Sequence, residues 1–227
     1  MSPTSVSDRV FGVLCEHIVS GRYAPGEKLP TQRALAADLG VNIGPVREAV
    51  KRLEQLRLVE VRHGDAMRVA DWRATSGLEA AAPLLFRPGG FDPDALAALM
   101  EARRVMLSQS ARFAAERRSD QQAAELERLA ARIADAGSDS DTVQALDFAF
   151  FAELIEAAGN LVFSLVMNSI RHLYLENARL FAGLVEDPEE LAPLYARAAR
   201  AVQGGNAARA ARAVEELTKL QEERVLA

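Results

Sequence analysis

GRYAPGEKLPTQRALAADLGVNIGPVREAVKRLEQL, residues 21–56, is the stretch that decides the fold of the first third of the chain. Two prolines and a glycine within residues 23–30 forbid a continuous helix and predict an extended connector. Thr31 and Asn42 are residue types that cap helix N-termini, and Gly40 between them is a residue type that ends helices. The stretch therefore predicts two successive helices separated by a tight turn.

The sequence on either side of this stretch completes a small domain. Apolar residues recur at helical spacing over residues 7–20, including the single cysteine, Cys15, which we interpret as a buried structural thiol. After residue 57 the pattern changes to short apolar strands around a turn at His63-Gly64-Asp65, which predicts a β-hairpin. Three helices followed by a hairpin predict a winged helix-turn-helix over residues 1–70, whose third helix enters the DNA major groove.

The remainder of the chain has a different pattern. Residues 71–76 form a polar linker, and from residue 77 onward every segment is helical in period, with no strand signal. The segments expected to be helical are residues 77–85, 93–117, 119–136, 141–158, 161–184, 188–203 and 207–224. We therefore expect a mainly α protein, in which an N-terminal winged helix-turn-helix precedes an all-helical C-terminal bundle over residues 77–227.

The charge of the chain is divided unevenly. The net charge is −5. Residues 1–70 carry ten Lys and Arg and eight Asp and Glu, whereas the other 157 residues carry seventeen Lys and Arg and twenty-four Asp and Glu. Only the first part is therefore expected to be attracted to phosphate. The sequence has neither an apolar run long enough to cross a membrane nor a signal segment, so we expect a cytoplasmic protein with no membrane partner.

An enzyme is the first alternative to a DNA-binding protein. Catalysis by the common routes needs a glycine-rich phosphate loop, a nucleophile elbow or clustered metal ligands. None of these patterns occurs, and the three histidines, His17, His63 and His172, are scattered along the sequence. We therefore expect no enzymatic activity.

The N-terminal stretch resembles the GntR family of bacterial transcription regulators. The match is carried by Gly21, Pro25-Gly26-Glu27-Lys28-Leu29-Pro30, Leu35-Ala36, Leu39-Gly40-Val41, Pro45-Val46-Arg47-Glu48-Ala49, Leu53-Glu54 and Leu58-Val59. The resemblance implies a transcription regulator, expected to be a repressor, that binds palindromic double-stranded operator DNA. It also implies a homodimer, because two recognition helices at a fixed spacing contact more base pairs than one.

Groove geometry and the resemblance together select the DNA-contacting residues. The side chains expected to face base edges from the start of the third helix are those of Asn42, Ile43, Gly44, Arg47 and Lys51. The resemblance adds Thr31 and Arg33 at the second helix, and His63 and Gly64 at the tip of the hairpin. A solvated surface charge is the alternative for Arg47. Many relatives carry a basic or hydroxyl residue in place of Ile43 and Gly44, so their operator sequence is not carried over.

The C-terminal part is similar to the helical ligand domain of FadR-like members of the family. The resemblance is carried by Glu101-Ala102-Arg103, Asp147, Ala157-Ala158-Gly159-Asn160 and Ala201-Val202 before Gly205-Asn206. Many such domains hold a divalent metal with an aspartate and three histidines. Asp147 is present here, but Phe151, Tyr195 and Leu217 stand at the histidine positions. The resemblance therefore implies that the metal site is lost and that no cofactor is bound.

Aromatic and aliphatic residues at these positions indicate a ligand with an apolar portion. Together with Met167 they are expected to line a cavity, although core packing is the alternative for most of them. The arrangement of Asp147 and Phe151 resembles fatty-acid-responsive regulators of actinobacteria, which implies a long-chain fatty acid or acyl-CoA as effector. Arg103 and Arg171 are candidates to hold its anionic end, and a surface ion pair is the alternative for each.

Two other functions stay open at this point. One is a regulator of a small-carboxylate catabolic pathway, which would need a short polar effector. The other is a dimerising DNA-binding protein whose helical domain has no effector at all.

Overall fold

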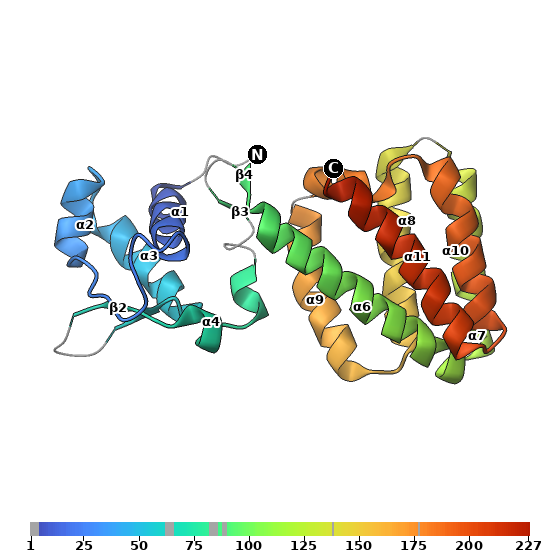
Figure 1. Ribbon diagram of the computed structural model, residues 1–227. Coiled ribbons are helices and arrows are strands. Elements are labelled where there is room, and N and C mark those ends of the chain that lie inside the picture. The colour runs from blue at the N-terminus through green and yellow to red at the C-terminus, as the bar shows by residue number, and fades with distance from the viewer. Residues whose placement is uncertain (1–4, 62–65, 82–85, 88–89, 138, 177) are drawn as a thin grey trace. The chain divides into compact units, whose positions relative to one another are not determined.

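The computed structural model describes residues 5–61, 66–81, 86–87, 90–137, 139–176 and 178–227. The chain divides into two compact units, Met1–Ala95 and Leu96–Ala227 (Figure 1). We describe each unit by itself. The domain boundary expected at residues 71–76 stays a prediction.

The N-terminal unit begins with three helices and a hairpin. The helices are α1 (Val6–Val19), α2 (Gln32–Asp38) and α3 (Ile43–Gln55), and strand β1 (Val59–Glu60) pairs antiparallel with β2 (Arg68–Val69). Val59 lies opposite Val69 in this pairing. The predicted winged helix-turn-helix is therefore confirmed.

Local chemistry explains where the second and third helices begin. The side chain of Thr31 accepts a hydrogen bond from the backbone N–H of Ala34 at 3.2 Å, so this residue caps α2. Asn42 stands at the N-cap position of α3, but its side chain makes no capping hydrogen bond. Gly40 follows the end of α2 with a φ of 64°, a left-handed conformation that glycine adopts at little cost.

The core of this unit fixes the orientation of α3. Its apolar stripe, which includes Val46, Ala49 and Leu53, is fully buried and packs in one cluster with Leu14 of α1 and with Leu58 ahead of β1. Because residues three and four apart share one face of a helix, the opposite face of α3 is left for solvent or DNA.

The segment after the hairpin differs from the sequence prediction. A short helix, α4 (Trp72–Thr75), lies within the predicted linker, and a 3-10 turn, η1 (Leu78–Ala80), lies within the predicted helix 77–85. The Ser76 hydroxyl ties this segment to α3 by donating to the carbonyl of Leu56 at 2.7 Å. The linker is thus fastened by hydrogen bonds that composition does not reveal.

The prediction that no strand follows residue 77 is wrong. Strands β3 (Phe86–Arg87) and β4 (Gly90–Phe91) form a second antiparallel hairpin. The glycines and proline between Arg87 and Phe91 are residues that favour a tight turn. The sequence pattern predicted helices over residues 77–85 and 93–117 and no strand between them.

The C-terminal unit is helical throughout its described residues, which confirms the predicted bundle. Its elements are α6 (Pro93–Arg117), α7 (Asp120–Asp135), α8 (Ser140–Ala157), α9 (Leu161–Glu176), the 3-10 segment η2 (Ala178–Val185), α10 (Pro188–Gln203) and α11 (Ala207–Val225). The helix expected over residues 161–184 is therefore divided into α9 and η2, because hydrophobic spacing over so few residues does not separate a period of 3.6 from one of 3.0.

Helix packing in this unit places α10 between α7 and α11 (Figure 1). Helix α6 is fastened to α11 by polar contacts: Arg104 Nε donates to Glu222 Oε2 at 2.8 Å, and Ser108 Oγ donates to the carbonyl of Ala211 at 3.2 Å. The helices α6, α8, α9 and η2 then surround a common interior, which is where the candidate effector site lies. Among the described residues, no helix is both long enough and apolar enough to cross a membrane.

We predict that Leu53→Ala lowers the free energy of unfolding of the N-terminal unit by about 2–5 kcal/mol, because a fully buried side chain leaves a cavity. Urea unfolding followed by circular dichroism measures the change. Leu78→Ala is the control, because Leu78 belongs to the same unit and is 47% exposed. An equal loss in both variants would contradict the assigned core.

Candidate DNA-binding surface and effector site

The outer face of α3 carries an exposed arginine and lysine. Arg47 and Lys51 are both exposed and lie one helical turn apart, so their side chains share a face. Within the described part of the chain, neither forms an ion pair. By contrast Arg52, on the side that faces α1, pairs with Asp8 at 2.7 Å and lies over the ring of Phe11. Arg47 and Lys51 are therefore available to an external anion.

The other residues predicted to contact DNA have different surroundings. Asn42 and Gly44 are exposed at the start of α3, and Arg33 is exposed on α2. Ile43 is half-buried and packs against the core of the N-terminal unit. Thr31 is exposed, and its side chain is engaged in capping α2. The last two, His63 and Gly64, lie outside the described residues.

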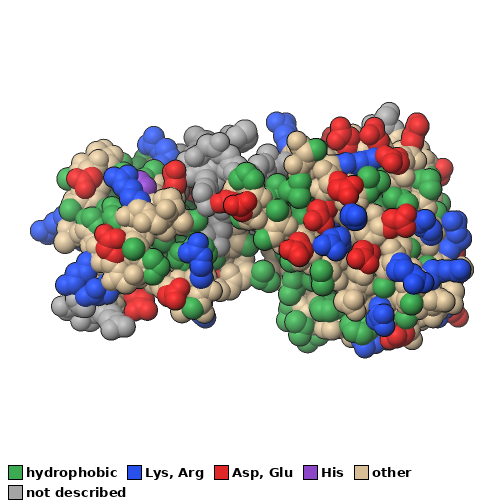
Figure 2. All heavy atoms as spheres, viewed as in Figure 1, with side chains coloured by type: hydrophobic (Ala, Val, Ile, Leu, Met, Phe, Trp, Pro, Cys, Tyr) green, Lys and Arg blue, Asp and Glu red, His purple; other side chains and the backbone are tan. Residues whose placement is uncertain are grey.

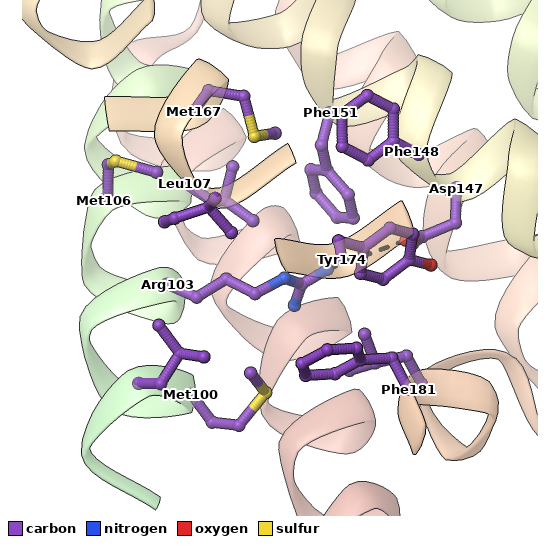
Figure 3. Close-up of a pocket in the computed structure, with 13 residues that line it drawn as sticks. Met100, Arg103, Met106, Leu107, Asp147, Phe148, Phe151, Met167, Tyr174 and Phe181 are labelled. Carbon is purple, nitrogen blue, oxygen red and sulfur yellow. Dashed lines mark ion pairs between the residues drawn. The ribbon is translucent and has the colours of Figure 1, made fainter. Parts of the chain in front are cut away.

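A largely apolar pocket lies inside the helical unit. The residues that line it are Leu99, Met100, Arg103, Met106 and Leu107 of α6, Asp147, Phe148 and Phe151 of α8, Met167, Ile170 and Tyr174 of α9, and Phe181 and Leu184 of η2 (Figure 3). The volume of this pocket is about 40 Å³. That is room for roughly three water molecules, at about 10–15 Å³ each.

Two polar side chains of the pocket, Arg103 and Asp147, belong to a buried network. Tyr195 donates its hydroxyl proton to Oδ1 of Asp147, and Gln221 Nε2 donates to the same oxygen at 2.8 Å. Arg103 Nη2 donates to Gln221 Oε1 at 3.0 Å and lies 3.8 Å from Oδ2 of Asp147. Four side chains from α6, α8, α10 and α11 are thus joined in one network.

Burial keeps the Tyr195 hydroxyl of this network protonated. Asp147 is only 2% exposed and Tyr195 is fully buried. Burial raises the pKa of Tyr195 well above its usual value, and the neighbouring carboxylate of Asp147 acts in the same direction. The hydroxyl therefore keeps its proton and remains a donor to Asp147.

Arg103 is the cation of the pocket. Its side chain is 15% exposed, and its guanidinium carbon lies 4.8 Å from the centre of the Phe151 ring. Figure 3 shows the guanidinium reaching from α6 toward Asp147 and Tyr174. At 3.8 Å from Oδ2 its contact with Asp147 is long, whereas the same Nη2 donates to Gln221 Oε1 at 3.0 Å. The guanidinium, which carries five N–H donors, can therefore hold a further acceptor.

Tyr174 supplies a second polar group beside Arg103. Its ring is stacked between Phe148 and Phe181, with ring centres 5.5 and 5.3 Å away, and the residue is 7% exposed. Its hydroxyl is buried and makes no hydrogen bond with the described residues. Burial also raises the pKa of Tyr174, so the hydroxyl is an uncharged donor. A buried donor without a partner carries a free-energy cost that a ligand oxygen would remove.

The structure brings together some of the residues predicted for the effector site and separates others. Arg103, Asp147, Phe151 and Met167 all line the pocket. Tyr195 and Leu217 are fully buried and do not line it; Tyr195 acts through Asp147. Arg171 is exposed, with its guanidinium carbon 5.6 Å from the centre of the Phe148 ring.

Sequence reasoning missed Tyr174 and Gln221. Gln221 follows Leu217 by one helical turn, so a helical-face argument from Leu217 would have reached it. Tyr174 lies on the same face of α9 as the predicted Met167, two turns later, and the same reasoning applies.

The residues around Asp147 do not fit a first-row divalent metal. Its partners are a phenol, an amide and a guanidinium, of which the last cannot ligate a cation. Among the described residues, no group of three or more His, Cys, Asp and Glu is placed to hold a metal ion.

We predict that Asp147→Ala lowers the free energy of unfolding by about 3–5 kcal/mol, because it leaves the guanidinium of Arg103 largely buried without its counter-charge. Thermal and urea unfolding measure this. Glu156→Ala is the control, since Glu156 is an exposed carboxylate on the same helix. If the two variants are equally stable, the network does not stabilise the unit.

Family comparisons cover both units. The model of the "Bacterial regulatory proteins, gntR family" matches residues 6–69, and the "FCD domain" model matches residues 98–219. The first match contains the helices and hairpin of the winged helix-turn-helix. The second contains α7, α8, α9 and α10 entirely, with most of α6 and α11, and therefore the whole effector pocket.

Individual relatives agree with these matches. The HTH-type transcriptional regulator Mce2R of Mycobacterium tuberculosis is 33% identical over 95% of this chain and 90% of its own length. The fatty acid metabolism regulator protein of Edwardsiella ictaluri is 29% identical over 74% of this chain and 69% of its own length. The solved structure of Streptococcus agalactiae GntR has a TM-score of 0.51 and is 25% identical, with 96% of this chain and 99% of that chain covered. The chain therefore belongs to the GntR family and is a DNA-binding transcription regulator whose C-terminal part is an FCD effector-binding domain.

Proposed function

We propose that the chain is a homodimeric repressor whose binding to palindromic operator DNA is weakened by a long-chain fatty acid or its CoA thioester. The observation that carries this proposal is the effector pocket, whose lining is apolar except at one end, where Arg103, Asp147 and the Tyr174 hydroxyl meet. An acyl chain with one polar end has the same division of chemistry.

The polar groups of the pocket favour a free fatty acid over its CoA thioester as the effector. A carboxylate can accept two N–H groups from a guanidinium in a bidentate pair, and Tyr174 can donate to it from the side. The carbonyl of a thioester carries no charge and gains less from Arg103. The name of the relative from Edwardsiella ictaluri, a fatty acid metabolism regulator, supports the same class of effector.

The size of the pocket means that a long acyl chain can bind only if the helical bundle expands. At about 40 Å³ the present space does not hold a long chain. Three of its lining residues, Met100, Met106 and Met167, are unbranched and flexible, and methionine adapts to new packing more readily than other apolar residues. A long chain would therefore bind an expanded form of the bundle, and its preference for that form is what shifts the equilibrium away from the DNA-binding form.

A short carboxylate is the second candidate, and the small present volume favours it. It would engage Arg103 and Tyr174 without expanding the bundle. A series of chain lengths separates the two candidates, because each buried methylene contributes about 0.8 kcal/mol only if the pocket opens to receive it.

We predict that calorimetry of the purified protein with fatty acids of increasing length shows affinity that rises with length, and that gel shifts show weaker operator binding in their presence. The rise reflects burial of successive methylenes. Binding that is strongest for short acids would favour the second candidate. No binding at any length would leave a DNA-binding protein without this effector.

Two variants, one inside the pocket and one outside it, test whether the acid contacts the polar residues of the pocket. Tyr174→Phe removes only an unpartnered hydroxyl, so it should weaken binding of the acid by about tenfold without lowering the melting temperature. Arg171→Gln removes an exposed guanidinium that does not line the pocket and should leave the affinity unchanged.

We also predict that Arg47→Ala lowers operator affinity by about tenfold or more while the melting temperature stays the same, because a bidentate base contact is worth about 1–3 kcal/mol and Arg47 is exposed. A gel-shift titration with the operator measures the loss. Arg73→Ala, which removes an exposed arginine of α4, is the control of equal charge. Unchanged affinity in the Arg47 variant would contradict its placement at the DNA.

A further inference from the structure

An arginine cleft lies on the surface of the helical unit, between α10 and α11. The residues that line this arginine cleft are Arg197, Arg200 and Ala201 of α10 and Arg209, Arg212, Ala213 and Glu216 of α11. Its volume is about 570 Å³, compared with about 40 Å³ for the effector pocket. Figure 2 shows Lys and Arg side chains gathered over these two helices.

The cleft follows from the way the two helices meet. Helix α10 ends at Gln203 and α11 begins at Ala207, so the helices run antiparallel from a short turn. On each helix the two arginines are three residues apart and share one face. The nearly buried alanines, Ala201 and Ala213, have small side chains and form the floor. Four guanidinium groups therefore rim a single opening.

The charge of the cleft is opposite to that of its surroundings. Residues 96–227 carry fifteen Lys and Arg and twenty Asp and Glu, a net charge of −5, yet four of those fifteen cations line this cleft. Glu216 pairs with Arg197. In the described part of the chain, Arg200, Arg209 and Arg212 form no ion pair, and all three are exposed. Like charges that line one opening repel one another, and a bound anion would relieve the repulsion.

We propose that the arginine cleft binds a small polyphosphate, of the kind carried by a nucleotide, separately from the effector pocket. Guanidinium groups match phosphate oxygens in bidentate geometry. The volume of the cleft is in the range of about 300–1,000 Å³ that is usual for small-molecule sites. Duplex DNA fits less well, because a long rod of negative charge would also face the acidic remainder of the unit.

Calorimetry of the full-length protein with inorganic tripolyphosphate tests the proposal. We expect saturable binding, with one site per chain, that weakens as salt is raised. The triple variant Arg200→Gln, Arg209→Gln and Arg212→Gln should lower the affinity at least about tenfold, since it removes three phosphate contacts. The control is Arg112→Gln, Arg128→Gln and Arg132→Gln, which removes the same charge from exposed positions on α6 and α7 and should change the affinity less than about twofold. Circular dichroism checks that both variants remain helical.

Three outcomes would overturn the proposal. Equal loss in both triple variants would mean that tripolyphosphate responds only to net charge. No binding at millimolar tripolyphosphate would leave the arginines as solvated surface charges. Binding of a poly-glutamate peptide that tripolyphosphate does not displace would assign the cleft to an acidic protein instead. None of these results depends on the acid binding at Arg103.

Discussion

The buried carboxylate of Asp147 is the constraint on which the arrangement of the helical unit depends. A charge that is almost fully removed from water is tolerated only when donors surround it, and here the donors come from three other helices. Tyr195 on α10 and Gln221 on α11 satisfy one oxygen, and Arg103 on α6 balances the charge. The positions of α6, α8, α10 and α11 are therefore specified together.

The same constraint produces the recognition chemistry. The guanidinium of Arg103 lies 3.8 Å from Oδ2 of Asp147, so it is only loosely paired, and it lines the pocket. Tyr174 faces the same space with an unpartnered hydroxyl. In this chain an arginine provides the positive charge of the pocket, so the anionic ligand that we propose would be held by hydrogen bonds and not by coordination.

Sequence could predict those features that follow from local spacing or from the resemblance. The buried stripe of α3 repeats with the helical period, so its exposed face, with Arg47, was predictable. The face of α11 that carries Gln221 was predictable from Leu217, but the contact of Gln221 with Asp147 was not, because only the packing of α11 against α8 brings the two residues together. The hairpin around residues 86–91 was missed because its strands are two residues long, too short to show alternation.

The helices α10 and α11 rim the arginine cleft and are hydrogen-bonded to Asp147 of the effector pocket, although neither helix lines that pocket. This link between the two proposed sites has a thermodynamic consequence. Tyr195 and Gln221 hold these helices to Asp147 on one side, and the arginine cleft spans them on the other. A polyphosphate across the cleft would hold α10 and α11 together, whereas a long chain in the pocket requires the bundle to expand. If expansion separates these two helices, each ligand weakens the binding of the other by the same factor, because coupling between two sites is reciprocal. If expansion instead moves only α9 and η2, which line the pocket, the two ligands bind independently. Whether the two ligands are coupled at all therefore shows whether α10 and α11 move when the effector enters.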